Sequence, residues 1–324
     1  MEPLLQVENL KTHFNTVRGV VKAVDGISFS VRKEEFFGLV GESGCGKSTT
    51  ALSIMRMLDD TARIDGRMIF KGKNIAELTR RQLRQLWGKS LFMIFQDPMT
   101  CLNPVMRIMG QLGEVFRMRE GRWLSKKEAT RKGVDLLRQV DILDPERVLE
   151  HFPHQLSGGM KQRVMIAFGI ALNPDLLLLD EPTTALDSTV QFKVVELLLN
   201  LKVKYKMSQI LITHDFGVAA KLCDRIAVMY AGKIVEQGRY VTLLNQPKHP
   251  YTEGLFECII KPGIKKDYLE TMKGYLPSLY DLPKGCYFEP RCEMRKETCS
   301  QKEPVLVDLG DEHLVACHLY HGAK

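Results

Sequence analysis

The chain has 324 residues, of which 44% are hydrophobic and 26% charged, a balance that excludes wholesale disorder. Its length suffices for one large domain or two smaller ones, and its formal net charge is +7. Residues 63–139 carry 17 Lys and Arg against 7 Asp and Glu, so the positive excess is concentrated there. Such a basic surface suits nucleic acid, an acidic membrane or a phosphorylated ligand, or it is simply a solvated helical surface.

The N-terminal sequence MEPLLQVENL has neither a basic start nor an apolar core, so no secretory signal is expected. No apolar run approaches the roughly 18–20 residues that crossing a bilayer requires. We therefore expect a cytoplasmic chain. In that reducing environment, disulfides are the weaker interpretation of the eight cysteines.

Short apolar segments typical of strands alternate with helical segments along most of the chain. Strands are expected at 4–10, 20–31, 36–40, 91–95, 176–180, 209–213 and 225–230, and a long helix at 190–205. This alternation predicts an α/β fold with a mostly parallel sheet and an antiparallel β part near the N-terminus.

Composition changes along the chain predict three parts. A nucleotide-binding domain is expected at 1–235, with a polar, basic helical subdomain inserted at about 97–160. A connecting extension is expected at 236–285, and a small Cys-rich lobe at 286–324. No major motif occurs twice, so the chain is expected to hold one nucleotide-binding unit.

The segment GESGCGKS at 41–48 fits the P-loop pattern and lies between an expected strand and an expected helix. Its glycines let the backbone turn tightly, so that successive N–H groups and the helix N-terminus face the phosphates. We expect Lys47 to reach the β- and γ-phosphates and the Ser48 hydroxyl to bind Mg²⁺. The expected nucleotide-binding set is Ser43, Gly44, Cys45, Gly46, Lys47, Ser48 and Thr49, with Cys45 contributing only its backbone.

A second motif, LLLLDEP at 176–182, places two carboxylates at the end of an apolar strand. Ligands bind at this end of the strands in open parallel sheets. Asp180 is expected to hold Mg²⁺ through a water, and Glu181 to orient and polarise the attacking water. Gln96 and His214 also follow expected core strands. We expect Gln96 to contact the metal and the water, and His214 to hydrogen-bond the γ-phosphate.

The segment LSGGMKQR at 156–163 precedes an apolar helix. Ser157 is a suitable N-cap, and Gly158 and Gly159 leave the helix N-terminus bare. An exposed helix N-terminus can bind phosphate, and the P-loop already holds one triphosphate. This motif is therefore expected to serve a nucleotide bound by another subunit.

These motifs resemble those of the ATP-binding subunits of ABC transporters, over essentially all of residues 4–324. The resemblance rests on the P-loop, Gln96, LSGG at 156–159, LLLLDEP, TALD at 184–187 and His214. It implies an ABC-type P-loop NTPase core and a head-to-tail dimer, with ATP between one subunit's P-loop and the other's residues 157–159. It also implies that Asp187 lies at the dimer seam and that Phe14 stacks on adenine, although strand packing is the alternative for Phe14.

The C-terminal sequence resembles the extension of oligopeptide and dipeptide importer ATPases, which related nickel importers share. The matching segments are PKHPYTEGL at 247–255 and LPKGCYFEPRC at 282–292, and residues 274–286 look most like the D-type subunit. Cys286, Cys292, Cys299 and Cys317 offer four thiolates, which suit zinc or an iron–sulfur cluster. Structural zinc favours tighter spacing. The family resemblance implies a 4Fe–4S cluster, with zinc or unligated cysteines as alternatives.

Together the motifs predict an ATPase that uses ATP and Mg²⁺ to drive import of dipeptides or oligopeptides from the cytoplasmic side of the membrane. The resemblance implies an F-type partner ATPase or a homodimer, two permease subunits contacted around DPMTCLNP (97–104), and an extracytoplasmic peptide-binding protein. The alternatives are import of nickel or another solute, a soluble ABC-type ATPase, and a redox or metal-sensing module. The basic segment 63–139 is then expected to face acidic lipid or permease loops and not nucleic acid.

Overall fold

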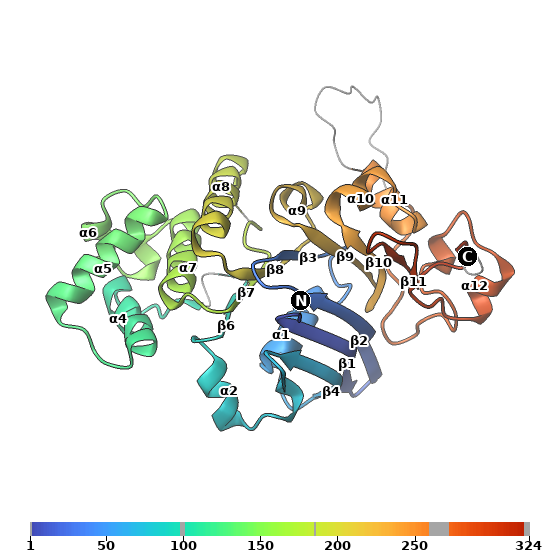
Figure 1. The fold of residues 1–324 in the computed structure, drawn as a ribbon, viewed down its shortest axis with the longest axis horizontal. Coiled ribbons are helices and arrows are strands. Elements are labelled where there is room, and N and C mark those ends of the chain that lie inside the picture. The colour runs from blue at the N-terminus through green and yellow to red at the C-terminus, as the bar shows by residue number, and fades with distance from the viewer. Residues whose placement is uncertain (1, 98–100, 185, 259–271, 321–324) are drawn as a thin grey trace. The chain divides into compact units, whose positions relative to one another are not determined.

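The computed structural model describes residues 2–97, 101–184, 186–258 and 272–320 (Figure 1). The chain divides into two compact units. The first unit contains Met1–Glu77 and Leu211–Lys324, and the second contains Leu78–Ile210. Within the described ranges, no helix has both the length and the apolar character that a membrane span requires. The three-part division expected from composition stays a prediction.

An antiparallel sheet forms the N-terminal part of the first unit, as expected. Its strand order is β2 (Gly19–Val31), β1 (Leu5–Thr16), β4 (Ala62–Phe70) and β5 (Lys73–Asn74). Leu5, Val7 and Leu10 of β1 are buried, with the alternation shifted by one residue at the irregularity between Val7 and Leu10, which gives this sheet one apolar face. The sequence pattern did not predict β4, because most of its first six residues are exposed and three of them are charged.

A second sheet brings further strands, two of them parallel, into the same unit. In it β3 (Phe36–Val40) pairs parallel with β9 (Arg225–Tyr230), and both strands are buried along their whole length. On the other side of β9 lies β10 (Lys233–Arg239), followed by β12 (Leu314–Val315) and β11 (Val307–Asp308), all antiparallel. The C-terminal hairpin therefore extends the sheet that holds β3.

Short helices complete the first unit. They are α1 (Lys47–Met55), α9 (Phe216–Leu222), α10 (Tyr240–Asn245), α11 (Pro250–Glu257) and α12 (Glu297–Gln301), with 3-10 turns at Ile75–Glu77 and Glu289–Arg291. Helix α1 follows β3 directly, so it begins at the carboxyl end of a buried parallel strand. This is the position that a P-loop requires.

In the second unit, β6 (Leu91–Ile94) pairs parallel with β7 (Leu176–Asp180). Its helices are α2 (Arg80–Leu86), α4 (Ile108–Glu120), α5 (Lys126–Gln139), α6 (Pro145–Glu150), α7 (Gly158–Leu172) and α8 (Ser188–Tyr205), with a 3-10 turn at Pro153–Gln155. Strand β8 (Ser208–Thr213) follows α8, and the division between the two units falls within it, after Ile210. The segment expected to be helical, 97–160, contains α4 to α6. Residues 98–100 of DPMTCLNP lie outside the described residues.

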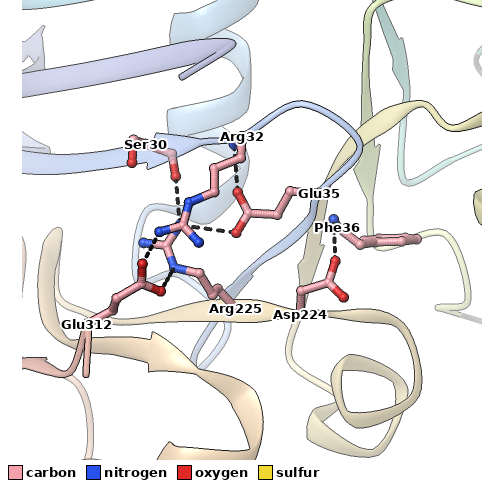
Figure 2. A network of polar contacts seen from close by, with 7 residues as sticks. All are labelled: Ser30, Arg32, Glu35, Phe36, Asp224, Arg225 and Glu312. Carbon is pink, nitrogen blue, oxygen red and sulfur yellow. Dashed lines mark hydrogen bonds and ion pairs between the residues drawn. The ribbon is translucent and has the colours of Figure 1, made fainter. Parts of the chain in front are cut away.

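A network of charged side chains with a buried pair at its centre ties the C-terminal hairpin to the core of the first unit (Figure 2). The Arg225 guanidinium at the start of β9 donates to Glu35 Oε1 at 3.0 Å and to the Ser30 carbonyl at 3.4 Å. The other oxygen of Glu35 accepts from the backbone N–H of Arg32 at 2.6 Å. Glu312, in the turn before β12, pairs with both Arg32 and Arg225. The side chains of Arg225 and Glu35 are only 8% and 5% exposed.

We expect Arg225→Met to lower the free energy of unfolding by about 3–5 kcal/mol, because it leaves the Glu35 carboxylate buried without its cation. Urea denaturation followed by circular dichroism measures this loss. Arg63→Met is the matched control, since the Arg63–Asp65 pair is exposed. It should change stability by no more than about 0.5 kcal/mol. Equal losses in the two variants would contradict the importance of the buried pair.

Candidate functional site

The P-loop connects β3 to α1, and its backbone passes very close to two neighbouring strands. Gly41 and Gly46 both have positive φ, at 153° and 105°. A Cβ atom at Gly41 would lie 2.3 Å from the Met229 carbonyl oxygen of β9, and one at Gly46 would lie 2.2 Å from the Ala23 carbonyl oxygen of β2. Only glycine fits at these two positions, so the loop conformation is fixed by steric contact.

Lys47 begins helix α1 and is 4% exposed. Its ammonium donates to the carbonyl oxygens of Gly41 at 2.8 Å and Glu42 at 2.9 Å, so the side chain folds back over the loop. The Gly46 N-cap supplies no side-chain hydrogen bond to the N-terminus of α1. The N-terminus of a helix beside a buried ammonium is an arrangement suited to a phosphate.

Cys45 is completely buried within the loop. Burial raises the pKa of its thiol, which keeps the sulfur protonated and unreactive. Its carbonyl accepts from Gly232 N at 2.8 Å. The Cys45 sulfur also lies 3.8 Å from Lys47 Nζ, and a role for the backbone alone stays a prediction.

Two further expected ligand contacts lie in the first unit. Phe14 is on β1, opposite Val21 and Ala62, and its side chain is half-buried. His214 follows β8 and is exposed. The next residue, Asp215, caps α9 by accepting from Gly217 N at 2.8 Å and Val218 N at 3.1 Å. Asp215 therefore has a structural role beside His214.

The carboxylates of LLLLDEP end β7 in the second unit. Asp180 and Glu181 are 5% and 7% exposed. Glu181 Oε2 accepts from Gln96 Nε2 at 3.2 Å and from Thr184 Oγ1 at 2.8 Å. Glu181 also has φ 45°, a left-handed conformation that is uncommon outside glycine and concentrates at functional sites. The structure thus brings Gln96 and Glu181 together. It also adds Thr184 to this cluster. Thr184 belongs to the TALD segment, in which the sequence analysis predicted a role only for Asp187.

The LSGG segment forms the N-terminus of α7. Ser157 is its N-cap, with Oγ accepting from Met160 N at 3.3 Å. Gly158 is exposed, and no atom lies within 4 Å of the position that its Cβ would occupy. This helix end is therefore exposed, and its binding of a nucleotide stays a prediction.

Gly159 has a packing role that the sequence did not reveal. A Cβ at this position would lie 2.5 Å from Cγ1 of Val190, so the glycine permits α7 to approach α8 closely. Asp187 caps α8, and its Oδ1 accepts from Thr189 N at 3.1 Å and Val190 N at 3.0 Å. The LSGG segment and Asp187 therefore lie at the N-termini of α7 and α8, and these two helix ends are in contact at Gly159 and Val190.

Cys286, Cys292, Cys299 and Cys317 are free thiols. Burial raises the pKa of Cys286 to about 12, and the other three thiols add to that rise. Cys286 N also donates to the Cys299 carbonyl at 2.8 Å. Within the described part of the chain, however, no three His, Cys, Asp or Glu side chains form a group that could hold a metal ion. The donor chemistry suits a soft metal, but the side-chain arrangement is not that of a metal site.

Two family models match the chain. The model of the ABC transporter family covers residues 24–184, and that of the oligopeptide/dipeptide transporter C-terminal region covers residues 235–299. The dipeptide transport ATP-binding protein DppD of Bacillus subtilis is 44% identical, over 98% of this chain and 95% of its own length. DppD of Haemophilus influenzae is 45% identical, over 97% of this chain and 95% of its own length.

Solved structures share the fold. The ATP-binding cassette MJ0796, in a dimeric post-hydrolysis state with ADP and Pi, has a TM-score of 0.66 at 25% identity and covers 73% of this chain and 98% of its own. The cbiO1 protein of Clostridium perfringens has a TM-score of 0.62 at 27% identity, and the match covers 76% of this chain and 92% of the cbiO1 chain. These matches confirm the expected α/β ABC-type fold. The chain belongs to the ATP-binding, ATP-hydrolysing subunits of ABC transporters, in the group that carries the oligopeptide/dipeptide transporter C-terminal region.

Proposed function

We propose that this chain hydrolyses ATP to drive import of dipeptides or oligopeptides, working at the cytoplasmic face of the membrane. The observation that carries the proposal is the region matching the oligopeptide/dipeptide transporters, which belongs to the same compact unit as the P-loop. Relatives that align over nearly the whole chain are named dipeptide transport ATP-binding proteins. This support favours peptides over nickel or another solute.

In the proposed mechanism, the P-loop N–H groups and Lys47 bind the phosphates of ATP. Ser48, Gln96 and Asp180 would hold Mg²⁺, which neutralises phosphate charge when bound. Glu181 polarises the attacking water, and its two hydrogen bonds to neighbouring side chains fix the direction of its carboxylate. His214 would contact the γ-phosphate.

We also infer that ATP binds between two subunits, with its adenine stacked on Phe14. The exposed N-terminus of α7 at Ser157 and Gly158 supports this arrangement, since a ligand can approach Gly158 without meeting a neighbouring side chain. Asp187 would lie at the same seam. An F-type ATPase is the proposed partner, with a homodimer as the alternative. Two permease subunits would carry the peptide delivered by an extracytoplasmic binding protein.

We further propose that the four C-terminal cysteines hold a 4Fe–4S cluster, with zinc as the alternative. Their support is chemical alone: four thiols within residues 286–317 offer an all-sulfur donor set, although among the described residues they are not gathered into a group that could hold a metal ion. A bound cation would stabilise the thiolates, whose formation burial now opposes. The cluster would supply a cross-link within a small lobe.

Glu181→Gln should retain ATP binding and lower turnover by about 10²-fold or more, because the amide no longer accepts a proton from water. Phosphate release and ATP affinity measured on the same preparation separate the two effects. Glu146→Gln is the control, since Glu146 forms only an exposed pair with Arg138. Hydrolysis by Glu181→Gln at the wild-type rate would exclude Glu181 as the base.

Purification with the permease partners should give an ATPase that is stimulated by a peptide-loaded binding protein. The measurement compares phosphate release in vesicles supplied with dipeptides, longer peptides or nickel. Stimulation by peptides alone is the expected result. Stimulation by nickel alone would replace the peptide proposal with its alternative.

Anaerobic purification should yield a brown protein with about four irons and four sulfides per chain. Cys286→Ser should lower the iron and sulfide content, whereas Cys258→Ser, outside the set of four, should not. Metal and acid-labile sulfide analysis measures both. Stoichiometric zinc without sulfide would reject the cluster, and a chain that holds neither would reject both metals.

A further inference from the structure

Glu42, the second residue of the P-loop, is held by two side chains from the C-terminal region. Its backbone N–H donates to the Tyr251 hydroxyl at 3.1 Å. Its carboxylate accepts two parallel hydrogen bonds from Arg291, Nη1 to Oε2 at 2.9 Å and Nη2 to Oε1 at 3.0 Å. Tyr251 and Arg291 both lie in the segment that matches the oligopeptide/dipeptide transporter C-terminal region.

Contacts other than the ion pair with Glu42 also hold the Arg291 side chain in place. Its side chain is only 6% exposed, and its Nε donates to the Lys273 carbonyl at 2.9 Å. The guanidinium lies over the rings of Tyr230 and Phe288, at 5.6 Å and 6.0 Å from their centroids. A bidentate guanidinium stacked on aromatic rings has a defined orientation, so it can define the orientation of Glu42.

Tyr251 is equally constrained. It is fully buried, with its ring edge-on to Tyr230 at 4.7 Å and tilted against Phe288 at 5.4 Å. Its backbone N–H donates to Nδ1 of His249 at 3.1 Å. Burial lowers the pKa of His249 to about 4, which keeps the imidazole neutral and able to accept this bond. The Tyr251 hydroxyl is therefore a fixed acceptor for the P-loop backbone.

The backbone carbonyl of Glu42 connects Tyr251 and Arg291 to the predicted phosphate site. Its carbonyl oxygen accepts from the Lys47 ammonium at 2.9 Å and from Cys45 N at 3.3 Å. Glu42 thus links the C-terminal region to Lys47. Its backbone N–H and side chain contact Tyr251 and Arg291, and its carbonyl contacts the lysine. An unpaired carboxylate in this loop would also repel a triphosphate, and Arg291 cancels that charge.

We propose that Arg291 and Tyr251 are positioning residues of the nucleotide site, which act through Glu42. Tyr251 holds the P-loop backbone, and Arg291 orients and neutralises the Glu42 carboxylate so that the loop accepts ATP. The C-terminal region thereby sets the affinity for nucleotide. The inference rests on the proposed binding of ATP at the P-loop and is independent of the imported solute.

The test is ATP affinity of the purified full-length chain, measured by competition with a fluorescent ATP analogue. Arg291→Gln should weaken ATP binding about tenfold, because it leaves a negative charge beside the phosphates. Adding Glu42→Gln to this variant should restore affinity to within about threefold of wild type, because the repelling charge is gone. Arg295→Gln is the matched control, since Arg295 pairs with Glu289 in the same lobe but is 60% exposed. It should leave affinity unchanged.

A purely structural role for Arg291 predicts no rescue by Glu42→Gln, and failure of that rescue would overturn the proposal. So would wild-type affinity in Arg291→Gln. If Arg291→Gln does not fold, the ATP affinity of Tyr251→Phe provides the test of the proposal. It removes only the acceptor of Glu42 N and should weaken ATP binding about threefold, whereas unchanged affinity overturns the inference. A wild-type chain that binds no ATP would instead reject the proposed function.

Discussion

The whole first unit depends on how closely the P-loop backbone approaches its neighbours. The carbonyl oxygens of Met229 and Ala23 lie where Cβ atoms at Gly41 and Gly46 would be. Strand β9 carries one of these oxygens and also pairs with β3, which leads into the loop, while β2 carries the other. A side chain at either glycine would push the loop away from the strands and misdirect the N–H groups of α1.

Carboxylates in the first unit are repeatedly matched by partners far along the chain. Glu35 pairs with Arg225, and Glu42 pairs with Arg291. Glu236 is fully buried and accepts from His249 N, and it contacts the imidazole of His313 at 2.6 Å. Each carboxylate would be costly without its partner, so the C-terminal region is an integral part of the nucleotide-binding unit.

The features that could be predicted from sequence are local ones. The buried runs of β3, β7 and β9 appear as continuous apolar segments, and the P-loop, Asp180 and Glu181 follow them directly. Strand β10 was not predicted, because Glu236 and Gln237 interrupt its apolar pattern. The role of Arg291 was missed for a different reason, because it depends on a contact between residues far apart in the sequence. Its partner Glu42 is 249 residues away and occupies a position where the P-loop pattern allows any residue.

The two units also differ in when their residues become available during synthesis. The second unit is one continuous stretch, so all of it has been made once residue 210 is added. The first unit joins residues 1–77 to residues 211–324, and its sheet includes β12 at residues 314–315. Domains fold as units during synthesis, and contacts between distant residues form slowly. The P-loop is therefore translated early but obtains its complete surroundings only after β12 has been synthesised.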